Sequence, residues 1–320
     1  MFLSFAPLEG ITTYTYRNLH NRLFGGADDY YAPFIAPDGS GNFKDSMLKD
    51  VLPENNSDIK LIPQILCNKA EAFLVVAKKL AELGYDEVNL NAGCASGTVV
   101  PKHKGAGMLI DLDSLDNFLD EVFSSCPIKV SVKTRMGVES TKEFPEILEI
   151  YNKYPLSKLI VHARDKAGKY QSKPDTDLFI SNFSNSKNIT AYNGDIFSLA
   201  HLNSMENKLP ELQHIMVGRG AIANPALPRM LKGGMAADLK EFKNFHDELV
   251  AEYRNIGLTE HFTVGRMKEL WYYGSYMFPN SSKSIKKIYK SRSLDDYLCA
   301  STSFFASEKF EPESYFRAGE

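Results

Sequence analysis

Eight short runs of apolar and β-branched residues recur along the first two thirds of the chain, separated by segments with a helical period. The runs are Leu3–Ala6, Asp29–Phe34, Lys60–Ile65, Glu87–Leu90, Ile128–Lys133, Lys158–Val161, Ile189–Tyr192 and Gln213–Val217. Strands that alternate with helices predict a parallel sheet covered by helices. Eight such units in about 230 residues favour an α/β fold of the (β/α)8 TIM-barrel type. The alternative is a doubly wound open sheet with fewer strands.

The segments between the runs give three clear helix signals. Lys69–Leu83 carries its apolar residues on one stripe, which is typical of an amphipathic helix. Asp113 is a suitable N-cap for a helix that ends near Ser125. Thr141–Tyr154 is a third helical stretch with Pro145 in its first turn, where a helix does not need the N–H that proline lacks.

The pattern changes after the glycine pair at 233–234, where we place a domain boundary. Only helical patterns follow, at Leu239–Tyr253, at Val264–Met277 and from Leu294 onward. We therefore predict a TIM-barrel domain over residues 1–235, followed by a small all-helical domain over residues 236–320.

The cysteines and the N-terminus limit the available classes of protein. The chain has four cysteines, none in a C-x-x-C pair, so their spacing predicts neither a metal site nor a disulfide framework. Free thiols fit a reducing cytosol, and the first ten residues lack the charged and apolar regions of a signal peptide. No stretch is apolar enough to span a bilayer. We expect a cytoplasmic protein with no metal and no membrane partner.

Charge gives no overall preference for nucleic acid, because the formal net charge is -3 at pH 7. Binding to nucleic acid would need a local basic patch. Two candidate patches are present, and each could also be ordinary solvated surface. The first comprises Lys283, Lys286, Lys287, Lys290 and Arg292, and the second Lys102, His103 and Lys104.

Polar residues and glycines gather at the ends of the predicted strands. In chain order they read APLEG after the first run, Gln64 in the third, NAGC, KTRMG, HAR, NGD and finally GRG. Core packing does not explain so many polar groups at these positions. Because the carboxyl ends of all barrel strands meet at one face, the pattern predicts a single active site there.

Two glycine-rich turns follow the seventh and eighth strands. They are Asn193-Gly194-Asp195 and Gly218-Arg219-Gly220. Glycine permits close backbone approach, and a following helix N-terminus offers N–H groups to an anion. These two loops are the usual phosphate site of a barrel, and Arg219 can add a charge-assisted hydrogen bond. Either motif alone often only makes a turn, but together they predict a phosphate-bearing cofactor.

Three further side chains have a catalytic and a structural interpretation. Lys133 could stabilise negative charge on a flavin ring, or could pair with a carboxylate at the barrel mouth. His162 could contact a ligand or be a satisfied structural histidine. Cys94 precedes a glycine-rich loop and could donate a proton, although most single cysteines are small buried apolar residues.

The motifs together resemble those of the tRNA-dihydrouridine synthases. The matching segments are APLEG-x-T, N-x-GC, V-x4-GAG, K-x-R-x-G, H-x-R, NGD and VGRGA-x-x-NP, in that order from Ala6 to Pro225. A weaker match follows at Arg266–Trp271. The N-x-GC motif followed by GAG discriminates best, because many flavin barrels share the phosphate motifs.

This resemblance implies an FMN-dependent enzyme that NADPH reduces. Hydride would pass from the flavin to C6 of a uridine turned out of the RNA stack, and Cys94 would protonate C5. Such a thiol must keep its proton, so Cys94 should not lie in a strongly cationic pocket. The implied cofactor-binding residues are Pro7, Leu8, Glu9, Gln64 and Lys133 at the ring, and His162, Asn193, Gly194, Asp195, Gly218 and Arg219 toward the phosphate. The implied substrate contacts are Asn91, Arg135 and Tyr170.

The chain departs from the family pattern at three places. Ala95 stands where the family has proline, and Leu8 stands where methionine is common. The segment His162-Ala163-Arg164-Asp165 replaces H-G-R-T, so Arg164 and Asp165 are poor candidates for a transferred role. None of these changes removes a group that the reaction needs.

The resemblance also implies tRNA as the partner, recognised by shape through the helical domain and the basic residues. We expect a monomer without an obligate protein partner. The APLEG opening is most similar to the bacterial C-type branch, which acts near the start of the D-loop. Three rival functions remain: the same reduction on ribosomal RNA, a flavin reductase of a small molecule, and a non-catalytic RNA-binding protein. The presence of Cys94 and Lys133 disfavours the last of these.

Overall fold

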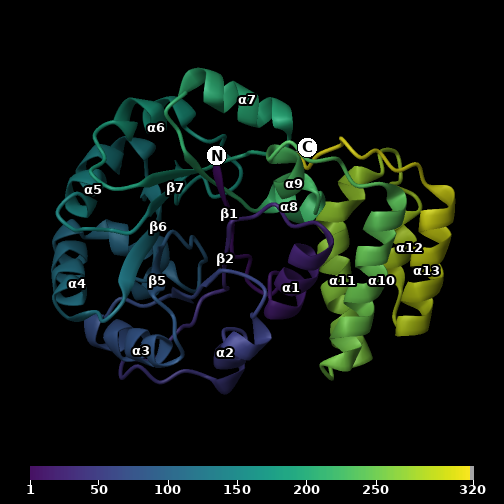
Figure 1. The fold of residues 1–320 in the computed structure, drawn as a ribbon, viewed down its shortest axis with the longest axis horizontal. Helices are drawn as coiled ribbons and strands as arrows, with labels where there is room; N and C mark the ends of the chain where they lie inside the picture. Colours follow the sequence, from purple (N-terminus) through teal and green to yellow (C-terminus); the bar gives the residue numbers. More distant parts are fainter. Residues whose placement is uncertain (318–320) are drawn as a thin grey trace.

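The computed structural model describes residues 1–317, and its core is a parallel β-barrel surrounded by helices (Figure 1). Every strand pairing is parallel, and the order is β3-β2-β1-β9-β8-β7-β6-β5-β4. The strands are β1 (Phe2–Phe5), β2 (Asp29–Tyr31), β3 (Leu61–Ile62), β4 (Gln64–Ile65), β5 (Glu87–Ala92), β6 (Lys129–Gly137), β7 (Leu159–Asp165), β8 (Thr190–Asn193) and β9 (His214–Val217). The predicted TIM-barrel class is confirmed.

The third predicted strand is two strands, so the expectation of eight was wrong by one. Pro63 separates β3 from β4, because proline has no N–H to donate to a ladder. β3 pairs with β2 and β4 pairs with β5. A parallel bridge from Ile35 to Ile65 joins the β2 side to β4 and closes the ring. The two short strands thus share one position of an eight-position barrel.

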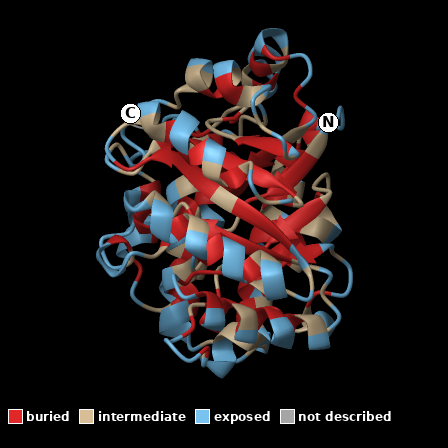
Figure 2. Ribbon diagram, turned by 90° about the vertical axis from the view of Figure 1, so that its left-hand side faces the viewer, coloured by how far each residue is buried: buried red, intermediate tan, exposed pale blue. Residues whose placement is uncertain are grey.

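Helices cover the outside of the barrel, and Figure 2 shows buried strands beneath helices whose outer faces are exposed. Their bounds are α1 (Tyr14–Leu23), α2 (Asp45–Lys49), α3 (Ala70–Glu82), α4 (Leu112–Ser125), α5 (Phe144–Tyr151), α6 (Thr176–Phe183), α7 (Leu199–Lys208), α8 (Arg219–Ala223) and α9 (Leu227–Leu231). Short 3-10 turns lie at Pro53–Asn55, Val100–Lys102, Gly105–Ile110, Thr141–Glu143 and Ser275–Met277. Within residues 1–317, no helix is both long and apolar enough to cross a bilayer.

Two helices begin differently from the prediction. The N-cap of α4 is Asp111, not Asp113, because the Asp111 carboxylate accepts from the Ser114 N–H at 3.0 Å. Asp113 lies in the first turn, where its charge favours the helix dipole. The stretch from Thr141 begins as a 3-10 turn, and Pro145 lies in the first turn of α5, as predicted.

The last four helices pack beside the barrel (Figure 1). They are α10 (Leu239–Asn255), α11 (Glu260–Gly274), α12 (Ile285–Lys290) and α13 (Leu294–Ser307). α10 lies against α1, where Phe245 packs edge-on to Tyr16 and Phe24 with ring centroids 5.4 and 5.3 Å apart. α11 lies against α8, so its residues reach the loop that carries the GRG turn. The domain boundary near residue 235 stays a prediction.

A segment after α13, which the sequence patterns did not indicate, returns to the barrel (yellow end in Figure 1). We call residues 311–317 the C-terminal strap. The Glu311 N–H donates to the Met277 carbonyl at 2.8 Å, and the Asn224 side chain donates to the Pro312 carbonyl at 3.1 Å. Phe316 is buried against Phe197, with ring centroids 5.5 Å apart. The strap thus connects the helical region to the loop after β8.

Candidate active site

The loops after β1, β7, β8 and β9 surround a small cavity of about 60 Å³ at the mouth of the barrel. The predicted site residues that line it are Pro7, Leu8, Lys133, His162, Tyr170, Asn193, Gly194, Asp195, Gly218 and Arg219. The remaining predicted residues lie in the surrounding strands and loops: Glu9, Gln64, Asn91, Cys94 and Arg135. The barrel topology therefore gathers most of the predicted site at one point.

One half of the mouth, from β7 to β9, is built around the carboxylate of Asp195. It accepts from Arg219 at 2.6 Å and from Arg164 at 3.1 Å, with a second, closer Arg164 contact. Arg164 is only 1% exposed and donates also to the Ser172 carbonyl. The two guanidinium groups and one carboxylate leave a net charge of +1 beside the two glycine turns. An anion such as a phosphate is therefore favoured here.

Arg164 is the residue that sequence reasoning set aside and that the structure places inside this half. Its Nη1 lies 3.1 Å from Nε2 of His162, two residues earlier on the same strand. Arginine can only donate, so this contact requires Nε2 to accept and places the His162 proton on Nδ1. Burial, together with the nearby cations Arg135 and Lys133, lowers the pKa of His162 well below its usual value. His162 is therefore neutral at pH 7, with one N–H available to a ligand.

Arg219 is enclosed by aromatic rings. Its guanidinium carbon lies 4.2 Å from the ring centre of Tyr170, 5.5 Å from Phe197 and 5.4 Å from Phe316. Such cation–π contacts hold a guanidinium in a fixed orientation. Tyr170 is 53% exposed and lines the cavity, whereas Phe316 comes from the strap. The position of the predicted phosphate arginine thus depends on segments that are far apart in the sequence.

Arg135 joins the two loops on either side of the mouth. Its Nε donates to the Gly93 carbonyl at 2.9 Å, and its Nη1 donates to the carbonyls of Asp165 and Lys169 at 2.7 and 3.2 Å. Within residues 1–317, Nη2 of Arg135 makes no hydrogen bond, so this nitrogen keeps its donor capacity. Tyr170 packs over the same guanidinium at 5.6 Å.

The other half of the mouth holds Cys94 on an anchored loop. Oδ1 of Asn91 accepts from the N–H groups of Gly93 and Cys94 at 3.1 and 2.9 Å. The Ala106 N–H donates to the Cys94 carbonyl at 3.0 Å. A Cβ at Gly105 would lie 2.9 Å from the Cys94 Cβ, and Gly105 has φ +58°, so only glycine fits there. The GAG motif therefore packs directly against the half-buried cysteine.

Lys133 lies between the two halves. It lines the cavity, and burial, followed by repulsion from Arg135, lowers its pKa to about 8, while Cys94 opposes the shift. We expected a thiol acid to avoid cations, yet Lys133 and Arg135 both lie near enough to interact with Cys94. The hydrogen bonds of Arg135 to three carbonyl oxygens offset part of that positive field.

Glu9 belongs to a neighbouring cavity of about 380 Å³, between the barrel mouth and the C-terminal helices. Arg266, from the RMKELW segment, lines the same cavity and packs against Gly10, where an added Cβ would lie 2.4 Å from Nη1. Partial burial and the nearby Asp50 raise the pKa of Glu9, and Arg266 opposes this. The cavity is thus a second opening next to the first, lined by both acidic and basic side chains.

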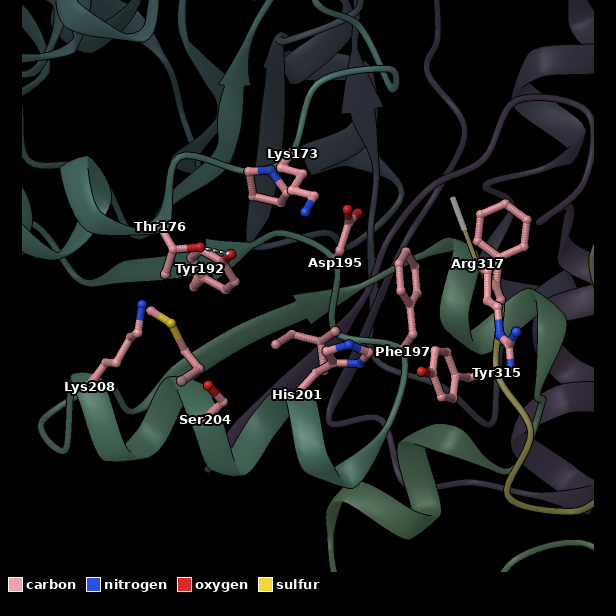
Figure 3. A pocket seen from close by; sticks show the side chains of 14 residues that line it. Lys173, Thr176, Tyr192, Asp195, Phe197, His201, Ser204, Lys208, Tyr315 and Arg317 are labelled. Carbon is pink, nitrogen blue, oxygen red and sulfur yellow. Dashed lines mark hydrogen bonds between the residues drawn. The ribbon is translucent and has the colours of Figure 1, made fainter. Parts of the chain in front are cut away.

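A third opening, a groove of about 670 Å³, lies on the far side of the Asp195 loop, against α7 and the strap (Figure 3). Lys173, His201 and Lys208 line it together with Tyr315 and further residues of the strap. Lys208 pairs with Asp177 at 3.0 Å. The groove shares Asp195 and its loop with the small cavity, so the loop forms a wall between them.

The predicted basic patches differ in structure. Lys286, Lys287 and Lys290 are exposed on α12, whose Ile285 and Ile288 are buried. The neighbouring Lys283 and Arg292 are exposed too. Lys102 and His103 are exposed on the loop after Cys94, whereas Lys104 donates to the Pro37 carbonyl at 3.2 Å. In the part of the chain that the structure describes, no group of three potential metal ligands is found.

Comparison with known proteins agrees with this geometry. The family model for dihydrouridine synthases matches residues 4–270. The chain belongs to the dihydrouridine synthase family. A tRNA-dihydrouridine(16) synthase of Neisseria meningitidis serogroup B is 28% identical over 236 residues, covering 71% of this chain and 70% of the relative. A Bacillus subtilis protein named "Probable tRNA-dihydrouridine synthase 2" is 27% identical over 267 residues, covering 79% of each chain.

The fold comparison supports the barrel independently. Histamine dehydrogenase from Rhizobium sp. 4-9 superposes with a TM-score of 0.55 at 10% identity, covering 81% of this chain and 49% of that one. At this identity the likeness concerns the fold alone. Family membership therefore rests on the sequence match, which spans both the barrel and the beginning of the helical region.

Proposed function

We propose that this dihydrouridine synthase family member reduces the C5=C6 double bond of a uridine in tRNA, using FMN and NADPH. One observation carries the proposal. A single barrel mouth joins a glycine-lined, positively charged cavity to a half-buried thiol on an anchored loop. The first feature suits a phosphate-bearing cofactor, and the second suits a proton donor.

The residues at the mouth fit FMN in charge and hydrogen bonding. Arg219 and the Nδ1–H of His162 are donors for the phosphate end, and Asn193 lines the same cavity. Lys133 is cationic at neutral pH beside Pro7 and Leu8, which offer an apolar contact for a ring. The cavity of about 60 Å³ is smaller than a ligand pocket of roughly 300–1,000 Å³, and we propose that the half-exposed Tyr170 moves to admit the cofactor.

The proposed reaction adds a hydride and a proton across one double bond. FMN, when bound, supplies the hydride that C6 of the uracil receives. Cys94 then donates the proton that C5 takes up, so the thiol becomes a thiolate that solvent reprotonates. Nη2 of Arg135 and the amine of Lys133 stabilise the negative charge that develops on the uracil carbonyl side. NADPH is the proposed source of electrons between turnovers.

RNA binding is proposed for the exposed basic residues of α12 and of the loop after Cys94. The exposed lysines of α12 and the exposed Lys102 and His103 supply phosphate contacts that bind RNA with little sequence preference. The cavity lined by Glu9 and Arg266 lies between the barrel and the C-terminal helices, next to the cofactor cavity. We propose that the target uridine is turned out of the RNA into this region.

The test is nucleoside mass spectrometry of unmodified tRNA incubated with the purified protein, FMN and NADPH. We expect dihydrouridine from the wild type and at least a hundredfold less from Cys94→Ala. Ribosomal RNA and free uridine serve as parallel substrates. Product on ribosomal RNA or on free uridine, with none on tRNA, would overturn the tRNA assignment in favour of that substrate.

The position in tRNA can be mapped in the same experiment by sequencing the product. The Neisseria relative is named for position 16, and the APLEG opening also favours the D-loop. We therefore propose position 16 as the modified uridine. Dihydrouridine confined to other positions would refute this part while leaving the reaction itself intact.

A further inference from the structure

Four polar side chains from β4, β5 and β6 form one hydrogen-bonded chain inside the barrel. Asn91 Nδ2 donates to Gln64 Oε1 at 2.7 Å, and Gln64 Nε2 donates to Asn89 Oδ1 at 2.7 Å. Asn89 Nδ2 then donates to Ser131 Oγ at 2.9 Å. Gln64, Asn89 and Ser131 are 0% exposed, and Asn91 is 9% exposed. We call these residues the amide chain.

The strand register explains why these side chains meet. Gln64 is paired with Asn89, and Asn89 is paired with Ser131. Asn89 and Asn91 are two residues apart on β5, so both point to the same face, which is the barrel interior. The amide chain therefore runs from the barrel interior up to the strand end that carries Cys94.

The amide chain has a direction. Each amide oxygen accepts from the partner nearer the Cys94 loop, and each amide N–H donates to the partner deeper in the barrel. At its top, Oδ1 of Asn91 accepts from the N–H groups of Gly93 and Cys94. A backbone N–H can only donate, so this end requires the Asn91 oxygen to face the loop. Rotating any one amide by 180° would set donor against donor, which a buried site tolerates poorly. The orientation of Asn91 is thus fixed from both sides, by the loop backbone at one end and by Gln64 inside the barrel at the other.

We propose that Asn89 and Gln64 are positioning residues for the proton donor Cys94. They hold the Asn91 amide in the orientation that anchors the backbone of Cys94, and through it the direction of the thiol. This inference rests on the proposed function of Cys94. It also gives Gln64 a second role beside the flavin contact that the family resemblance implies, because each of its amide atoms makes one hydrogen bond inside the barrel and has capacity for another.

The first variant is Asn89→Leu, which keeps the side-chain size and removes both hydrogen bonds of Asn89. We expect kcat for dihydrouridine formation to fall by about tenfold, the scale of a partly misplaced catalytic group. FMN affinity and the rate of flavin reduction by NADPH should change by less than about threefold. The matched control is Thr190→Val on β8, which removes partly buried hydrogen bonds that are not part of the amide chain.

A double-mutant cycle separates positioning from general damage. In a Cys94→Ala background, Asn89→Leu should have no further effect on kcat, because its role acts through the thiol. A full tenfold loss in that background would overturn the proposal. Asn89→Leu could fail to fold, and Ser131→Ala is the variant for that case. It removes only the hydroxyl that accepts from Asn89 at the inner end of the amide chain. It should lower kcat by about threefold with the same dependence on Cys94.

A second readout does not need turnover. Alkylation of Cys94 by iodoacetamide, followed site by site with mass spectrometry, should be at least about threefold faster in Asn89→Leu than in the wild type or in Thr190→Val. Freeing the loop backbone from Asn91 exposes the half-buried thiol. An unchanged alkylation rate would reject the positioning role. If the wild type reduces no RNA while the alkylation rates differ as expected, the proposed function fails and the amide chain still positions Cys94.

Discussion

The two halves of the barrel mouth are built with opposite chemistry. On the β4–β6 side, neutral amides and backbone N–H groups hold Cys94. On the β7–β9 side, a carboxylate and two guanidinium groups are packed among aromatic rings around Arg219. Amides anchor the Cys94 backbone without adding to the charge that Lys133 and Arg135 already place near it, whereas fixed cations suit an anionic phosphate. The contrast indicates that one half positions a proton and the other binds a charge.

The halves also differ in where along the chain the residues that hold them in place are found. The amide chain lies entirely inside the barrel and uses only neighbouring strands. The Arg219 side depends on Phe316 of the strap, which reaches the barrel only after α13. A change in the helical region can therefore reach the phosphate side directly, whereas its path to the Cys94 loop runs through Tyr170 and Arg135.

The largest expected effect is confined to the proton-donor half. Cys94→Ala should lower kcat for dihydrouridine formation by about 10²–10⁴-fold, the usual contribution of a positioned general acid. FMN affinity should stay within about twofold, because Cys94 does not line the phosphate cavity. Single-turnover reduction of tRNA and a flavin fluorescence titration measure the two quantities. A matching loss of FMN binding would mean that the halves are not separate.

The next largest effect is expected on the β7–β9 side, where FMN binding should change and kcat should not. Arg219→Ala should weaken FMN binding by about ten- to a hundredfold, since it removes a charge-assisted hydrogen bond worth roughly 1.5–3 kcal/mol. At saturating FMN, kcat should recover to within about threefold of wild type. Arg219→Lys should fall between, because lysine keeps the charge but loses the flat group that stacks on Tyr170. A loss of kcat that excess FMN does not restore would place Arg219 in the chemical step instead.

A smaller effect tests the strap. Phe316→Ala should weaken FMN binding by about three- to tenfold, because it removes one of the aromatic rings that hold the Arg219 guanidinium in place. The control is Tyr315→Ala, whose ring packs on His201 and does not contact Arg219. Calorimetric titration with FMN measures both variants. Equal losses in the two would indicate general loosening of the strap, and the specific contact would be refuted.

The fold and the meeting of the strand ends could be predicted because barrel topology is nearly determined by the alternation of strands and helices. Once strands were placed, residues as distant as Pro7 and Arg219 had to share one face. The interruption at Pro63 was readable too, since a proline inside a run cannot donate to its neighbour. The amide chain left a signal in the polar residues Asn89 and Asn91, two apart in an otherwise apolar strand.

Other features had no local signal. The strap is held by contacts between residues far apart in the chain, such as Asn224 with Pro312, which no periodicity predicts. Arg164 was set aside because its surroundings departed from the family pattern. Its spacing of two from His162 nevertheless placed it on the same face of β7. Local sequence patterns thus predicted where the site lies. The residues that hold the site in place, such as Arg164 and the strap, became apparent only in the tertiary structure.

The smallest expected effect concerns Lys133, which lies between the halves. Its pKa is lowered to about 8, so the amine carries its charge below this pH and loses it as the pH rises through it. If the charge stabilises the developing negative charge on the uracil, kcat at saturating FMN should be about half its pH 7 value near pH 8 and should fall further above it. Lys133→Arg stays charged across this range and should remove the decline, although its absolute rate can differ. An identical alkaline decline in Lys133→Arg would assign the titration to another group. A decline that instead follows FMN affinity would assign the charge of Lys133 to cofactor binding and not to the chemical step.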